Sequence, residues 1–105
     1  MAGLGKFLKQ AQKMQEQMQK VQAELAQREV EATSGGGAVK AVAKCDGTIA
    51  RIKIDPKVVD PGDIEMLEDL IVSAVTNALE VAKKTQNDEM SKLTAGMNLP
   101  PGLGL

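Results

Sequence analysis

The fold is decided first by residues 4–28, which read LGKFLKQAQKMQEQMQKVQAELAQR. Apolar side chains recur in this stretch at alternating spacings of three and four residues, as at the a and d positions of a heptad. These apolar positions are Leu4, Phe7, Ala11, Met14, Met18, Val21 and Leu25. The residues between them, chiefly Gln, Lys, Glu and Ala, favour helices. The pattern predicts an amphipathic helix with an apolar seam that must be buried. We expect it to be a dimer seam, the alternative being that it packs on the chain's own sheet.

Residues 29–54 change to a period of two, which is typical of β-strands. Polar and apolar residues alternate over 29–33, 38–45 and 48–54. The Ser34-Gly35-Gly36-Gly37 run predicts the first turn, and Asp46-Gly47 is a strong hairpin signal. In the third strand, strict alternation places Ala50, Ile52 and Ile54 on one face and Ile49, Arg51 and Lys53 on the other. The segment therefore predicts a three-stranded antiparallel meander with one apolar and one charged face.

A second long helix is predicted after the sheet. Asp60 is suited to be its N-cap and Pro61 its first helical residue, with Asp63 in the first turn. The apolar stripe that follows is wide enough to cover a sheet face. It contains Ile64, Leu67, Leu70, Ile71, Ala74, Val75, Ala78, Leu79 and Ala82, and its phase returns at Met90, Leu93 and Met97. Asn87-Asp88 either breaks this helix or forms a polar turn of it. Gly96 and the Pro100-Pro101-Gly102 run end it.

The predicted fold class is therefore α+β, with a long helix before a three-stranded antiparallel meander and a long helix after it. We interpret residues 1–105 as a single domain, with 97–105 as a loosely ordered tail. The chain has one Phe and no Tyr or Trp, so its core is built from small and aliphatic side chains. Domains of this size without disulfides or metals often gain burial by oligomerising.

Few residues in the chain are suited to catalysis or metal binding. There is no His, so a general base would have to be a carboxylate or a Lys. The Gly35-Gly36-Gly37 run lacks the Lys-Ser/Thr of a phosphate-binding loop. Cys45, the single Cys, is best interpreted as a small buried apolar residue at a strand end. The acidic residues Glu65, Glu68 and Asp69 are explained by a helix dipole rather than by a cation. We therefore expect that the protein is not an enzyme and that it binds no cofactor and no metal.

The sequence also favours a cytoplasmic location. The N-terminus lacks the apolar stretch of a signal peptide, and no apolar run approaches the roughly 18 residues of a membrane span. A single unpaired thiol suits a reducing compartment.

Charge is polarised along the chain although the net charge is only −1. In the heptad frame Lys6, Lys13 and Lys20 all fall at position c, and Lys9 lies beside them at f. This stripe stays exposed when the seam is buried, and lysines so placed can neutralise nucleic-acid phosphates. The alternative is an ordinary solvated helix face. A second basic group on the charged sheet face is best explained by cross-strand ion pairs with Glu29 and Glu31. Its members are Lys40, Lys44, Arg51 and Lys53.

Several segments, in order and nearly end to end, carry a family resemblance. They are Gly3-Leu4-Gly5, residues 9–20 (KQAQKMQEQMQK), Ile54-Asp55-Pro56, residues 65–70 (EMLEDL) and residues 96–102 (GMNLPPG). Together they resemble the YbaB/EbfC family of bacterial nucleoid-associated proteins. The resemblance implies an intertwined homodimer whose helices project from a joined central sheet like the arms of tweezers. It also implies duplex DNA as partner, association with the nucleoid, and a role in nucleoid organisation and gene regulation.

The family motifs identify no single contact residue. We therefore expect DNA contacts at the first-helix lysines Lys6, Lys9, Lys13 and Lys20 and, less directly, at Lys83, Lys84 and Lys92. The alternative function is a protein-interaction or chaperone-like module that grips polypeptides between its helical arms. Its contacts would be Met14, Met18, Met90 and Met97, because Met-rich surfaces adapt to varied partners.

Overall fold

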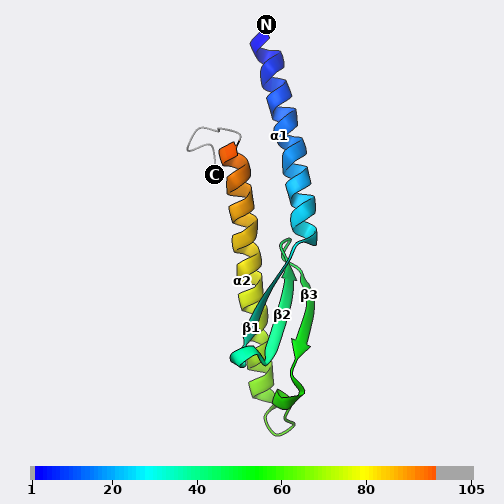
Figure 1. Ribbon diagram of the computed structural model, residues 1–105, viewed down its shortest axis with the longest axis vertical. Helices are drawn as coiled ribbons and strands as arrows, with labels where there is room; N and C mark the ends of the chain where they lie inside the picture. Colours follow the sequence, from blue (N-terminus) through cyan, green and yellow to red (C-terminus); the bar gives the residue numbers. More distant parts are fainter. Residues whose placement is uncertain (1, 97–105) are drawn as a thin grey trace.

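The computed structural model describes residues 2–96 as two long helices and a three-stranded sheet (Figure 1). The elements are α1 (Ala2–Gln27), β1 (Glu29–Ser34), β2 (Val39–Lys44), β3 (Ile49–Ile54) and α2 (Ile64–Gly96). Short 3-10 turns lie at Gly35–Gly37, between β1 and β2, and at Pro56–Val58, after β3. This arrangement confirms the predicted α+β class and element order. The predicted loose tail, 97–105, lies outside the described residues.

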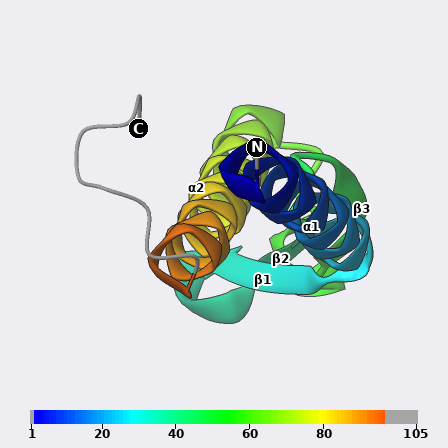
Figure 2. The same ribbon diagram turned by 90° about the horizontal axis from the view of Figure 1, so that it is seen from above.

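The sheet is an antiparallel meander in the order β1-β2-β3, as predicted. Helix α2 runs along one face of it and contacts β1 and β2, whereas β3 lies at the edge that α2 does not cover. Figure 1 shows α1 leaving from one end of the sheet, and the view from above in Figure 2 shows that it lies beside α2. The molecule is consequently long and narrow, with principal extents of 74 × 24 × 16 Å.

The core lies between α2 and β2 and is made of small side chains. Ala74, Ala78 and Ala82 form one line along α2, and each is at most 1% exposed. They pack on Val39, Ala41 and Ala43, which are fully buried on β2. Alanines at this spacing let the helix backbone approach the sheet closely, so the packing needs no aromatic side chain.

Helix α2 begins later than the sequence predicts. The prediction of Asp60 as N-cap and Pro61 as the first helical residue is wrong, because the helix starts at Ile64. Asp63 is the cap, and its Oδ1 accepts a hydrogen bond from the Met66 backbone N–H at 3.2 Å. Asp60 instead organises the preceding turn by accepting from the Gly62 N–H at 2.9 Å.

Helix α2 is also continuous through Asn87, so of the two alternatives the polar turn is correct and the break is not. In a helix interior, Asn and Asp each lower helix stability by well under 1 kcal/mol relative to Ala. Packing of the flanking residues offsets this loss. Met90, Leu93 and Thr94 beyond this turn are half-buried. Over the described residues, neither α1 nor α2 is long and apolar enough to cross a membrane.

Strand β3 contains a bulge that strict alternation could not predict. Arg51 pairs with Val42, but Ile49 pairs with Ala43, which leaves Ala50 as an extra residue. Paired residues point to the same side of a sheet, so Ile49 shares the α2-facing side with Ala43 and Ile52. The predicted placement of Ile49 on the charged face is therefore wrong. Because α2 packs mainly on β1 and β2, Ile49 and Ile52 of the edge strand remain 36% and 40% exposed.

Candidate nucleic-acid interface

The apolar seam of α1 is buried over only half its length. Leu25 is 4% exposed, and Met14, Met18 and Val21 are half-buried against the rest of the chain. Leu4 and Phe7, by contrast, are 58% and 66% exposed, and Ala11 is exposed as well. The second half of the seam thus packs within its own chain, while the first half projects beyond the end of α2 (Figure 1).

The lower end of α1 is tied to both the sheet and α2 by Arg28. Its guanidinium Nη1 donates to Glu89 Oε1 of α2 at 3.3 Å, and its carbonyl accepts from the Cys45 backbone N–H at 3.0 Å. These contacts set the direction in which α1 leaves the sheet. Sequence reasoning missed the Arg28–Glu89 pair, since the two residues are 61 positions apart and no local pattern links them.

The four first-helix lysines occupy one exposed stripe. Lys6, Lys9, Lys13 and Lys20 are all exposed, and their spacing puts them on the side of α1 opposite the apolar seam. Within residues 2–96 none of the four forms an ion pair with a carboxylate. The stripe therefore offers four positive charges to solvent along one side of a projecting helix.

The three α2 lysines do not form a comparable stripe. Lys83 and Lys84 are exposed, but consecutive helical residues point about 100° apart, so their side chains diverge. Lys92 Nζ lies 3.5 Å from Glu89 Oε1, the same oxygen that Arg28 contacts, so its charge is partly balanced. On this geometry α1 presents the more concentrated positive surface.

Ion pairs reduce the positive charge of the outer sheet face, as predicted. Arg51 donates through both terminal nitrogens to Glu29, at 2.9 and 3.1 Å, and Lys40 Nζ lies 3.9 Å from Glu31. The hydrogen bond from Arg51 lowers the pKa of the Glu29 carboxyl, and Glu29 in turn raises the pKa of Arg51. This face is therefore a weaker candidate for phosphate contact than α1.

Cys45 is a structural residue, as its place at the strand end predicts. It is 1% exposed, and burial raises the pKa of its thiol. The adjoining hairpin is fixed by Asp46, whose Oδ1 accepts from both the hydroxyl and the backbone N–H of Thr48. The hydroxyl contact lowers the pKa of the Asp46 carboxyl. In the part of the chain that the structure describes, no three His, Cys, Asp or Glu residues gather as metal ligands.

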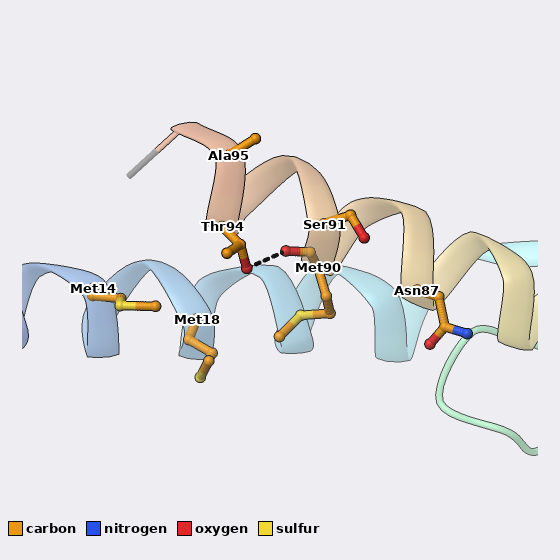
Figure 3. Close-up of a pocket in the computed structure, with 7 residues that line it drawn as sticks. All are labelled: Met14, Met18, Asn87, Met90, Ser91, Thr94 and Ala95. Carbon is orange, nitrogen blue, oxygen red and sulfur yellow. Dashed lines mark hydrogen bonds between the residues drawn. The ribbon is translucent and has the colours of Figure 1, made fainter. Parts of the chain in front are cut away.

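A groove of about 670 Å³ lies between the upper parts of α1 and α2 (Figure 3). Three methionines line it, Met14 and Met18 from α1 and Met90 from α2. The other lining residues are Asn87, Ser91, Thr94 and Ala95. The structure thus brings together three of the four methionines in the alternative hypothesis; the fourth, Met97, lies outside the described residues.

Comparison with known proteins identifies the family of this chain. The model of the YbaB/EbfC DNA-binding family matches residues 1–97. The chain belongs to the YbaB/EbfC DNA-binding family. A nucleoid-associated protein of Clostridium novyi is 52% identical over 97 residues, which are 92% of this chain and 85% of that protein. A nucleoid-associated protein of Acetivibrio thermocellus is 50% identical over 100 residues, 95% of this chain and 88% of its own length.

The YbaB/EbfC fold is also seen in a solved structure. An uncharacterized protein of Helicobacter pylori superposes with a TM-score of 0.71 at 17% sequence identity, over 89% of this chain and 95% of that one. At this identity the likeness concerns the fold alone. The family membership confirms the resemblance that the sequence segments indicated. The family is described as DNA-binding, so the relevant property of the α1 surface is whether it can contact DNA.

Proposed function

We propose that this YbaB/EbfC protein binds duplex DNA as a homodimer through contacts between lysines and phosphates, in the cytoplasm at the nucleoid. The observation that carries the proposal is the stripe of Lys6, Lys9, Lys13 and Lys20, which is exposed and lies opposite the apolar seam. The family's DNA-binding description and the nucleoid-associated names of the relatives support it. The proposed role is nucleoid organisation and gene regulation, by binding rather than by catalysis.

The dimensions of the stripe suit a polyanion. Lys6 and Lys20 are fourteen residues apart, which is about 21 Å at the rise of an α-helix. Each phosphate neutralised by a lysine releases counterions, with a slope of about −0.9 in log affinity against log salt concentration. If all eight lysines of a dimer contact phosphates, the slope is about −7.

A homodimer is supported by apolar surface that one chain leaves uncovered. Ile49 and Ile52 of β3 lie on the same side of the sheet as the buried core residues of β2, yet both are exposed. Within residues 2–96, β3 also has no strand paired to its outer edge, and natural proteins usually cover such an edge. We propose that the two copies meet at β3, which joins their sheets and leaves both α1 helices projecting. Two stripes then act together, offsetting the low net charge of one chain.

The test is a charge reversal of the stripe with a charge-matched control. Replacing Lys6, Lys13 and Lys20 together with Glu is expected to weaken binding to mixed-sequence duplex DNA by at least 100-fold at moderate salt, since three attractions become repulsions. The control replaces Lys44, Lys53 and Lys57 with Glu, which changes net charge equally but leaves α1 intact. Affinity is measured by gel shift over a salt titration.

Three outcomes are distinguishable in this experiment. Loss of affinity in the α1 variant alone, with a shallower salt slope, supports the stripe. Equal loss in both variants means that overall charge, rather than α1, governs binding. Unchanged affinity in the α1 variant would contradict the proposal.

A second candidate function, the gripping of polypeptides, is favoured by one observation. Met14, Met18 and Met90 line a single groove, and methionines adapt to varied apolar partners. On this candidate, replacing Met14 and Met18 with Gln abolishes the suppression of aggregation of an unfolded client protein. The stripe variant would retain that suppression, whereas the DNA-binding proposal predicts no dependence of DNA affinity on the two methionines.

A further inference from the structure

The projecting half of α1 carries apolar side chains that nothing within residues 2–96 covers. Leu4, Phe7 and Leu8 are 58%, 66% and 54% exposed. Leu4 and Phe7 lie on the same side of the helix as the two groove methionines of α1, because all four are a and d positions of one heptad pattern. Figure 1 shows this half of α1 extending past the described end of α2. One side of α1 therefore has an uncovered apolar half and a second half that borders the methionine groove.

The two halves are complementary when a second copy of α1 runs antiparallel to the first. One antiparallel register then places every a position opposite a d position of the other helix. The pairs are Leu4 with Val21, Phe7 with Met18 and Ala11 with Met14, each formed twice. Phe7, the single aromatic residue of the chain, meets methionine sulfur in this register, and such contacts are favourable. A parallel pair would bring one uncovered half against the other and leave both methionine grooves outside the contact.

The charges along α1 allow two copies to meet on this side. The e and g positions flank a coiled-coil seam, and charges at these positions decide which partners and orientations are allowed. Over residues 4–21 the flanking positions carry no charge, since they hold Leu8, Gln10, Gln15 and Gln17. The lysines of the stripe lie at c and f, on the outer side of such a pair. Identical helices can therefore pack here without like charges across the seam.

The size of this contact indicates what it can hold together. The overlap from Leu4 to Val21 is about 27 Å long at the rise of an α-helix and about 10 Å wide, a footprint of roughly 300 Å² per copy. Stable interfaces of standard size bury about 800 Å² per partner. The α1 contact is thus too small to hold a stable dimer alone, and it suits a weaker contact between dimers that already exist.

We propose that the α1 helices of two different dimers pack antiparallel, with Phe7 of each inserted into the methionine groove of the other copy. The partner is a second copy of this chain, and the contact is additional to the dimer contact proposed at β3. Each dimer has two α1 helices, so the two kinds of contact together link dimers into larger assemblies. The lysine stripes stay on the outside of each helix pair. Where the proposed DNA binding holds, such an assembly contacts DNA at several points at once.

Sedimentation velocity of the full-length protein, over a concentration series up to about 1 mM, tests the association of dimers. Species larger than a dimer are expected to grow with concentration. Phe7→Ser should raise the dissociation constant between dimers at least about tenfold, because each helix pair loses two buried aromatic side chains. The control is Val72→Ser, which removes an apolar side chain that is 63% exposed on α2 and should change nothing.

Two results of this series would overturn the proposal. An unaltered protein that stays dimeric throughout, or associates no better than Phe7→Ser, has no contact of this kind. Conversion of Phe7→Ser into monomers would mean that α1 holds the primary dimer rather than linking dimers.

Salt separates this contact from DNA binding. The contact is apolar and the lysines of the paired helices repel each other, so salt should strengthen the association of dimers by screening that repulsion. Binding to phosphates weakens with salt instead. Phe7→Ser keeps every lysine, and the charge-reversed stripe variant keeps Phe7. Failure of one proposal is therefore seen without failure of the other, whereas association that weakens with salt would contradict an apolar contact.

Cross-linking tests the antiparallel register. In a Cys45→Ala background, Ala11→Cys places two thiols about 5 Å apart along the axis of the helix pair. A short bismaleimide should join two chains through Ala11→Cys at least about tenfold faster than through Ala23→Cys, the same change at an exposed position on the outer side of α1. Leu4→Cys should also react slowly, because antiparallel packing separates the two copies of residue 4 by about 26 Å. Fast cross-linking through Leu4→Cys would indicate a parallel pair, and equal rates for Ala11→Cys and Ala23→Cys would exclude packing on this side. Either result overturns the proposal.

Discussion

The turn between β1 and β2 contains three glycines with positive φ, and at Gly35 alone of the three would a Cβ meet another residue. Gly35 has a φ of +59°, and a Cβ built on it would lie 2.9 Å from Leu70 Cδ2 of α2. Beside it, the Ser34 hydroxyl donates to the Leu70 carbonyl oxygen at 2.6 Å. The turn therefore sits against α2 with no room for a side chain. Gly35→Ala is expected to lower the free energy of unfolding by about 2 kcal/mol, through backbone strain and the clash together.

Gly36 provides the matched control for this substitution. It has a similar φ of +68°, but no atom lies within 4 Å of where its Cβ would be. Gly36→Ala carries the backbone strain alone and should cost about 1 kcal/mol. Urea denaturation of both variants measures the difference. Equal losses would mean that Leu70 shifts without cost and that the close approach at Gly35 has no energetic weight.

At the scale of elements, the fit of α2 onto the sheet rests on its alanine line. Ala78 is fully buried at the centre of that line, between Ala74 and Ala82. Ala78→Leu adds three carbons where the helix and β2 are in contact, and overpacking of this kind costs about 1–3 kcal/mol. The matched control is Ala23→Leu, which makes the same change at an exposed position of α1 and should leave stability nearly unchanged. Thermal unfolding of the two variants measures the difference. A melting temperature of Ala78→Leu no lower than that of Ala23→Leu would contradict the close packing.

Periodicity in the sequence predicts the elements well because each has one buried side, but it fails where a contact is not local. The bulge at Ala50 shifts the alternation of β3 by one residue, and only the pairing with Ala43 reveals it. The start of α2 at Ile64 was missed because Asp60 and Asp63 are equally good caps by composition. The lysine stripe of α1 follows from spacing alone. The groove of Met18 and Met90 does not, since it depends on how two helices pack.

At the scale of the whole molecule, the chain is more extended than a compact domain of its length. Its Cα radius of gyration is 19.9 Å, whereas a compact chain of this length has about 13 Å. Its two ends also differ in charge. The α1 arm carries the lysine stripe, and the far end, around the start of α2, carries Asp60, Asp63 and Glu65. A dimer joined near the sheets would keep the acidic ends away from the DNA held by the arms.

The proposed dimer contact at β3 can be tested by placing a charge in it. Ile52→Lys puts an ammonium group where the second copy would cover an apolar side chain, and burying an unpaired charge costs several kcal/mol. We expect the dimer dissociation constant to rise at least about 100-fold. Lys53→Gln, on the opposite side of the same strand, is the control and should leave dimerisation unchanged. Sedimentation equilibrium measures both variants.

Monomeric Ile52→Lys should also bind DNA more weakly and with about half the salt slope, because each particle then carries one stripe instead of two. Should Ile52→Lys remain a dimer with the affinity of the unaltered protein, the copies meet elsewhere than at β3.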